Sequence, residues 1–161
     1  MDRFSILEVI EQAVQTEKLG NQFYTTIAQK FEENEGLRNL FEKLAVKELV
    51  HAKTFSELKE IIGNEEPEGW EEVSQYLRAI VESSFFLGKD KSLPSLKEVK
   101  GVEDAINYAI GFEKETLLYY LGVRDGVKEK EVVDEIINEE RSHIMWLSKF
   151  RPEGGRTVLR P

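Results

Sequence analysis

Apolar residues recur at steps of three and four along most of the chain, a spacing that predicts amphipathic helices. No alternation typical of a β-strand persists anywhere in the sequence. Residues 88–101 are expected to form a loop. The pattern therefore predicts an all-α protein with one shorter helix over about residues 70–87 and four long helices over about 4–32, 35–62, 102–123 and 127–150.

Short polar segments separate these predicted helices. Asn34-Glu35-Gly36 lies between the first two, which are therefore expected to form an antiparallel hairpin. Ile62-Gly63-Asn64, followed by EEPEG, is expected to end the second helix. Arg124-Asp125-Gly126 is expected to end the third long helix.

Ionisable side chains interrupt the apolar stripes of the four long helices. Four glutamates and both histidines of the chain occupy such stripe positions: Glu17, Glu48, His51, Glu113, Glu140 and His143. Each histidine follows a glutamate by three residues, so the two side chains of each E-x-x-H unit face the same direction on a helix. An unpaired carboxylate buried at such a position loses several kcal/mol of solvation.

An internal repeat shows that these positions are related. AVQTEKLGNQFY at 13–24 aligns without gaps with AIGFEKETLLYY at 109–120, at a separation of 96 residues. The two E-x-x-H units stand 92 residues apart. Each half of the chain therefore contains a helix with one core-facing glutamate, followed by a helix with E-x-x-H.

Four carboxylates pointing into one bundle would repel one another unless cations lay between them. Two divalent cations would balance the four negative charges, and the two imidazoles would complete the coordination. Carboxylate oxygen combined with imidazole nitrogen suits Fe(II) and Mn(II), with Zn(II) as an alternative.

Composition narrows the possible functions further. The 161 residues suit a single domain, and a formal net charge of −9 disfavours nucleic acid and anionic membranes as partners. The absence of cysteine excludes disulfides, thiolate metal sites and iron–sulfur clusters. No apolar run reaches the ~18 residues of a membrane span, and the N-terminus lacks a signal-peptide pattern. A cytoplasmic protein is expected.

In their order along the chain, four motifs resemble the rubrerythrin branch of the ferritin-like superfamily: E-x-x-G-x-x-F-Y at 17–24, E-L-V-H at 48–51, A-I-x-x-E at 109–113 and E-R-S-H at 140–143. Its di-iron bundles take one glutamate from each of two helices and E-x-x-H from each of the other two. The resemblance implies a ferritin-like antiparallel four-helix bundle over residues 1–151. It also implies an additional helix in the long second-to-third-helix crossover, and a homodimer. Residues 152–161 are expected to be flexible or docked on a partner.

The same resemblance assigns roles within a di-iron centre that would also be catalytic. Glu48 and Glu140 would bridge the two metal ions, and His51 and His143 would each cap one of them. The outer carboxylates would be those of Glu17 and Glu113.

Three further residues lie on the ligand-bearing faces. Tyr24 and Tyr120 follow the outer glutamates by seven residues, where they would either hydrogen-bond the metal ligands or simply fill the bundle core. Gly20 lies one turn after Glu17, at a position where a mid-helix glycine costs up to about 1 kcal/mol relative to alanine. It would either leave space for a small oxidant or permit close approach of helices.

The sequence also departs from its relatives. Typical rubrerythrins carry a four-cysteine rubredoxin domain that supplies electrons, so turnover here is expected to need an external electron donor protein. Thr116 occupies the place of an additional family glutamate, which places the usual peroxidase mechanism in doubt. Leu49 stands where bacterioferritins carry the haem methionine, and no haem is therefore expected.

The leading interpretation is a di-iron oxidoreductase that reduces hydrogen peroxide or dioxygen. Two Fe(II) ions would each donate one electron to the oxidant and would then be re-reduced by the external donor. Two alternatives stay open: an iron-binding ferroxidase for iron handling, and a non-catalytic helical interaction module that retains a metal site.

Overall fold

The computed structural model describes residues 4–151, and this part of the chain contains five helices and no strand. The tail predicted over 152–161 lies outside the described residues. None of the described helices is long and apolar enough to cross a membrane. The predicted all-α class is confirmed, and the helices are α1 (Ile6–Lys30), α2 (Glu35–Ile61), α3 (Trp70–Ser83), α4 (Val102–Gly126) and α5 (Lys130–Lys149).

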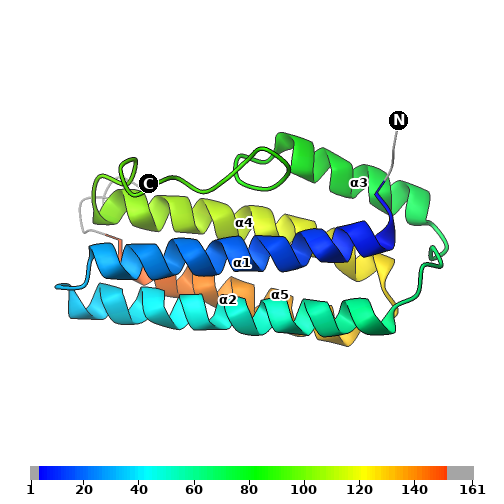
Figure 1. Cartoon of the computed structure of the whole chain (residues 1–161), viewed down its shortest axis with the longest axis horizontal. Coiled ribbons are helices and arrows are strands. Elements are labelled where there is room, and N and C mark those ends of the chain that lie inside the picture. The colour runs from blue at the N-terminus through cyan, green and yellow to red at the C-terminus, as the bar shows by residue number, and fades with distance from the viewer. Residues whose placement is uncertain (1–3, 152–161) are drawn as a thin grey trace, which may run out of the picture.

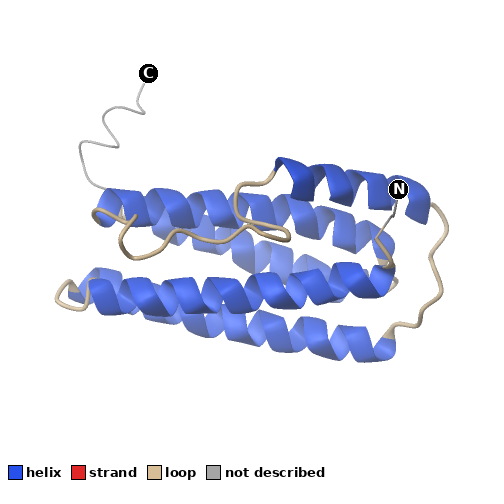
Figure 2. Cartoon of the chain, turned by 45° about the horizontal axis from the view of Figure 1, so that its top comes forward, coloured by secondary structure: helices blue, strands red, loops and turns tan. Residues whose placement is uncertain are grey.

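Four of the helices form the predicted antiparallel bundle, and α3 lies in the crossover between α2 and α4 (Figure 1). α1 pairs with α2, and α4 pairs with α5, each as an antiparallel hairpin. The connection from α2 to α4 returns along the length of the bundle, with α3 packed on α4 (Figure 2). As a result α4 runs antiparallel to α1, so that the two halves of the chain face each other.

Side-chain caps define where the first two helices begin. Ser5 Oγ accepts a hydrogen bond from the Glu8 amide at 3.1 Å, and the Glu8 carboxylate accepts one from the Ser5 amide at 3.3 Å. Asn34 Oδ1 accepts from the Leu37 amide at 3.1 Å. Asn34 is therefore the N-cap of α2, and Gly36, predicted to lie in the break, belongs to the helix.

α3 ends at Ser83, so the helix predicted over 70–87 is too long by four residues. The carboxylate of Glu115 accepts hydrogen bonds from the amides of Phe85 and Phe86, at 2.7 and 2.9 Å. Lys91 Nζ donates to the carbonyl of Ser84 at 2.7 Å. These side chains satisfy backbone groups that continued helix would need, and they anchor the crossover to α4.

α4 continues through Gly126, whereas the sequence pattern ended it before Arg124. The end of the helix is held by α5, because Lys130 Nζ donates to the carbonyl oxygens of Arg124 and Val127, at 2.8 and 3.1 Å. Arg124 also pairs with Asp134. These contacts place the turn between the two helices at residues 127–129.

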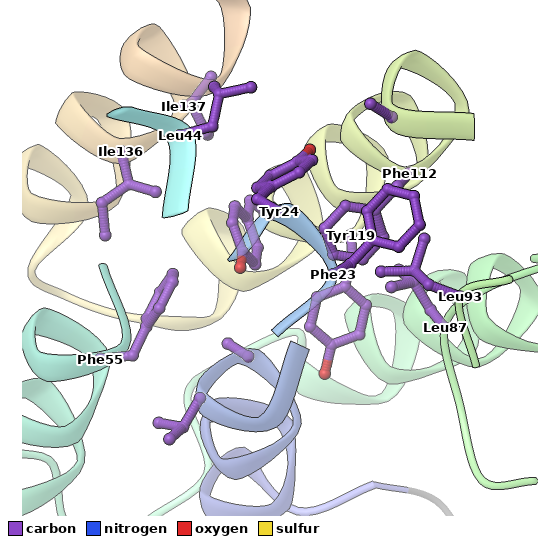
Figure 3. Packing of buried hydrophobic residues seen from close by; sticks show 14 of the residues in the cluster. Phe23, Tyr24, Leu44, Phe55, Leu87, Leu93, Phe112, Tyr119, Ile136 and Ile137 are labelled. Carbon is purple, nitrogen blue, oxygen red and sulfur yellow. The ribbon is translucent and has the colours of Figure 1, made fainter. Parts of the chain in front are cut away.

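Aromatic residues fill much of the bundle interior (Figure 3). Tyr24 packs against Phe41 and Phe112, with ring centroids 5.7 and 6.3 Å apart, and Phe55 packs against Tyr120 at 4.9 Å. Burial of such side chains is the main stabilising contribution in a helical bundle. This packed core surrounds the ionisable residues and separates them from water.

Candidate metal centre

The four bundle helices bring all six ionisable residues together in the interior. α1 supplies Glu17, α2 supplies Glu48 and His51, α4 supplies Glu113, and α5 supplies Glu140 and His143. Each of the six residues is at most 1% exposed. The structure thus assembles every residue that the sequence predicted for the site.

The six side chains form two overlapping groups whose potential ligand atoms lie within 4.8 Å of one another. Both groups contain Glu48 and Glu140. One group is completed by Glu17 and His51 and the other by Glu113 and His143. Because Glu48 and Glu140 belong to both groups, their carboxylates could each bind a cation in either group, as bridging ligands do.

Both histidines direct Nδ1 toward the carboxylates. His51 Nδ1 lies 2.7 Å from Glu140 Oε1 and 3.5 Å from Glu17 Oε2. The contacts of His143 that the repeat relates to these are 3.7 Å from Nδ1 to Glu48 Oε1 and 3.4 Å from Nδ1 to Glu113 Oε1. The two rings are 5.8 Å apart and inclined by 17°. The internal sequence repeat is therefore matched by the same pairing of side chains in both halves, although His51 lies closer to Glu140 than His143 does to Glu48.

Tyr24 and Tyr120 each hydrogen-bond an outer carboxylate on the opposite half of the chain. The Tyr24 hydroxyl donates to Glu113 Oε1 at 2.7 Å, and the Tyr120 hydroxyl donates to Glu17 Oε1 at 2.6 Å. Both roles considered for these tyrosines are present, because the rings pack in the core and the hydroxyls contact site residues. Glu17 thereby keeps its other oxygen, Oε2, 3.5 Å from His51 Nδ1, whereas in Glu113 the same Oε1 faces both Tyr24 and His143.

Crowding of buried carboxylates shifts the pKa values of the site. Burial, reinforced by Glu140 and Glu17, raises the pKa of Glu48 well above its ordinary range. Burial also raises the pKa of Glu113 to about 8. Although burial lowers the pKa of His51, the neighbouring carboxylates of Glu140 and Glu17 outweigh it and raise that pKa to about 11.

The same balance raises the pKa of His143 to about 9, with Glu113 and Glu140 as the compensating partners. Burial raises the pKa of Glu140, but the close Glu113 carboxyl and the two imidazoles outweigh it and leave a lowered pKa. The cluster without a metal ion therefore holds protons near neutral pH. Those protons balance the negative charge of the carboxylates, as a bound cation would.

Many polar atoms of the cluster lack a hydrogen-bond partner among the described residues. They include both oxygens of Glu48 and Glu140, the second oxygens of Glu17 and Glu113, and all four imidazole nitrogens. Buried polar atoms are nearly always satisfied in proteins. Oxygen and nitrogen ligand atoms converging in two groups fit two divalent cations.

Gly20 lies against the site, but it does not open a space there. A Cβ atom at this position would come within 2.9 Å of the Phe112 ring and 3.3 Å of the Glu48 carboxyl carbon. The space considered for a small oxidant is filled by these two side chains. Gly20 therefore serves close packing of α1 against α4 and of the Glu48 carboxylate against α1.

Two acidic residues make contacts that the sequence did not predict. Glu115 anchors the crossover through the backbone amides of Phe85 and Phe86. Glu139 Oε2 lies 3.5 Å from His51 Nε2. The only sequence signal for Glu139 is its place directly before Glu140, at the repeat position of Lys47.

Tyr120→Phe is expected to weaken binding of the adjoining metal ion by roughly tenfold, because outer contacts that orient metal ligands have effects of this size. The substitution removes the hydrogen bond to Glu17 and leaves the ring in place. Tyr119→Phe is the matched control, since the Tyr119 hydroxyl donates to the Val9 carbonyl at 2.9 Å, away from the carboxylates. Isothermal titration with Mn(II) measures both; equal affinities for the two variants would contradict the role of Tyr120.

Fold and site together define a ferritin-like four-helix-bundle protein with a buried glutamate–histidine cluster. The model of the rubrerythrin family matches residues 8–100, and the chain belongs to that family. The match includes Glu17, Glu48 and His51, whereas Glu113, Glu140 and His143 lie beyond it and are placed by the structure.

The fold is also similar to a crystal structure of a Thermotoga maritima protein described as a ferritin-like diiron-carboxylate protein. The two share 22% sequence identity with a TM-score of 0.70, over 96% of this chain and 99% of the other. This likeness supports the ferritin-like bundle. A comparison with curated proteins found no significant match.

Proposed function

We propose that the chain is a di-iron oxidoreductase that reduces hydrogen peroxide or dioxygen with electrons from an external donor protein. The observation that carries this proposal is the buried cluster of four glutamates and two histidines with unpartnered ligand atoms, inside a rubrerythrin-family bundle. A structural role alone does not account for it, because burying such a cluster without cations is costly.

Each residue has a distinct task in this proposal. Glu48 and Glu140 would be shared between the two ions, while Glu17 with His51 and Glu113 with His143 would complete the separate positions. Bound iron supplies the electrons that reduce the oxidant. The carboxylates stabilise the higher positive charge of the oxidised ions, and the surrounding aromatic core excludes water and large reductants.

Iron is the proposed metal because mixed carboxylate and imidazole ligands suit Fe(II). Mn(II) suits the same ligands, and Zn(II) binds to them as well. Zn(II) does not change its oxidation state, so only a redox-active ion would support the proposed reaction. Replacing iron by zinc therefore separates binding from catalysis without altering the chain.

The protein loaded anaerobically with Fe(II) is expected to consume hydrogen peroxide faster than the same concentration of free Fe(II). One peroxide takes two electrons and two protons to form two water molecules, so two Fe(II) ions are oxidised for each peroxide. Stopped-flow absorbance with a peroxide assay measures rate and stoichiometry, and the Zn(II)-loaded protein is the control.

A rate no higher than that of free Fe(II) would contradict the proposal. Repeated turnover after addition of a reductant would support an oxidoreductase. Release of Fe(III) after a single oxidation, or growth of a mineral, would instead support the ferroxidase alternative. If the folded protein does not bind iron, the remaining alternative is the non-catalytic helical interaction module.

A further inference from the structure

The outward nitrogen of His51 faces a carboxylate. His51 Nε2 lies 3.5 Å from Glu139 Oε2, and the other oxygen of Glu139 lies 3.5 Å from Lys47 Nζ. The His51 side chain is 1% exposed, whereas the Glu139 side chain is 34% exposed. Glu139 therefore links a buried imidazole of the metal centre to an ion pair at the protein surface.

His143 has different surroundings. Within residues 4–151, its ion-pair contacts all run through Nδ1, on the side of the cluster. Its ring lies 5.2 Å from the Trp146 ring, and Lys43 Nζ lies 3.8 Å from the centroid of that ring. An indole ring that carries an ammonium group over it thus lies near His143, where a carboxylate lies near His51.

The sequence repeat identifies the origin of this difference. Lys47 and Glu139 directly precede the two bridging glutamates and stand 92 residues apart, the same separation as the two E-x-x-H units. They are therefore equivalent positions in the two halves, and they carry opposite charges. The two halves of the site contain the same types of ligand residue but carry opposite charges at this pair, which forms an ion pair between α2 and α5.

We propose that Glu139 is a positioning residue that holds His51 with Nδ1 toward the cluster, so that the metal position formed with Glu17 binds a divalent cation more tightly than the position formed with Glu113. A carboxylate that accepts the Nε2 proton fixes the tautomer and ring orientation and increases the basicity of Nδ1. Such a contact changes metal affinity by roughly 10–100-fold. The inference rests on the two-metal site of the proposed function.

A Zn(II) titration followed by NMR of the imidazole rings tests this order of binding. The chain contains two histidines, so one His143→Gln variant assigns both sets of ring resonances. In the natural sequence, the first equivalent of Zn(II) is expected to shift the His51 resonances. The His143 resonances should respond roughly 10–100-fold less readily. Zn(II) gives this readout without oxidation chemistry.

Three variants at the half-exposed pair separate positioning from general stability. Glu139→Gln is expected to weaken the His51 step by roughly tenfold or more and bring the two steps together. Lys47→Gln removes the surface ion pair but keeps the carboxylate, and should preserve the order. The double exchange Lys47→Glu with Glu139→Lys keeps the net charge and moves the carboxylate to the half of the site that contains His143. It is expected to reverse the order of binding.

Parallel response of both rings in the natural sequence would overturn the inference while leaving a two-metal site in place. An order of binding that the double exchange does not change would also overturn it. If Zn(II) shifts neither ring, the metal site itself is contradicted, and with it the proposed function. Thermal unfolding of each variant confirms that the fold is retained before its titration is compared.

Discussion

Glu140→Ala is expected to abolish the binding of both metal ions. Glu140 belongs to both groups of ligand atoms, and neither of its oxygens has a hydrogen-bond partner in the described structure. Its removal takes one ligand from each position and one negative charge from between the two cations. Metal analysis after desalting is expected to change from two ions per chain to nearly none.

Two further variants make this result specific. Glu17→Ala removes a ligand from one group only, so about one ion per chain should remain. Glu57→Ala changes an exposed residue of α2 and should keep two. Removing Glu140 also takes the nearest carboxylate from the buried His51 imidazole, so the metal-free Glu140→Ala protein should unfold at a lower temperature than the metal-free natural sequence, and its metal content is compared at a temperature where it is folded. Retention of two ions by Glu140→Ala would contradict its bridging role.

The metal-free protein is expected to lose stability as the pH rises from about 5 to 9. The pKa of Glu113 is raised from an ordinary 4.5 to about 8, so the folded state binds more protons than the unfolded state in this interval. The pKa of His51 is raised to about 11 and that of His143 to about 9, from an ordinary 6.5. Their stabilising contributions are complete below the ordinary pKa and disappear as the pH rises through the raised ones.

Glu140 does not reverse this trend, because its lowered pKa acts below the ordinary value of 4.5. A bound cation replaces the protons, so metal affinity is expected to rise over the same pH interval. Cation at 1,000 times its dissociation constant adds about 4 kcal/mol of stability, or about 10 °C in unfolding temperature for a chain of this size.

Thermal unfolding with EDTA and with Mn(II), at pH 6, 7.5 and 9, measures both effects. The difference in unfolding temperature between the Mn(II) and EDTA samples should increase as the pH increases. Tyr119→Phe is a suitable comparison, since it alters a buried hydrogen bond outside the cluster and should change stability without changing this pH dependence. Metal-free stability that is constant or rises with pH would contradict the protonated cluster.

The six site residues could be predicted from the sequence because charge is conspicuous on an apolar stripe. Glu17 and Glu113 occupy positions that helical periodicity assigns to the core, and the repeat relates one to the other. Local spacing also determines that His51 and His143 face the same way as the glutamates that precede them. These features depend on helix geometry alone, and the structure assembles them as expected.

The ends of α3 and α4 could not be predicted in the same way. Glu115 and Lys91 determine where α3 stops, through contacts that span 30 and 7 residues of the chain. Lys130 and Asp134 hold the end of α4 from the next helix. Local propensity carries no information about such partners, because they meet only after the bundle has formed.

Contacts around the site could not be predicted from the sequence either. Glu139 looks like one more surface acid until α2 and α5 bring it beside His51. Gly20 allowed two interpretations, and only the positions of Phe112 and Glu48 decide between them. Distances between helices, rather than spacing within one helix, carry this information.

The most direct test of the central claim is the iron content per chain after anaerobic reconstitution with Fe(II) and removal of unbound ion, read together with the absorption spectrum. A di-iron oxidoreductase should hold two irons per chain. Its near-ultraviolet absorbance should rise rapidly with one equivalent of peroxide and fall again on reduction. Fewer than about one iron per chain, or two irons whose spectrum does not respond to peroxide, would contradict the account.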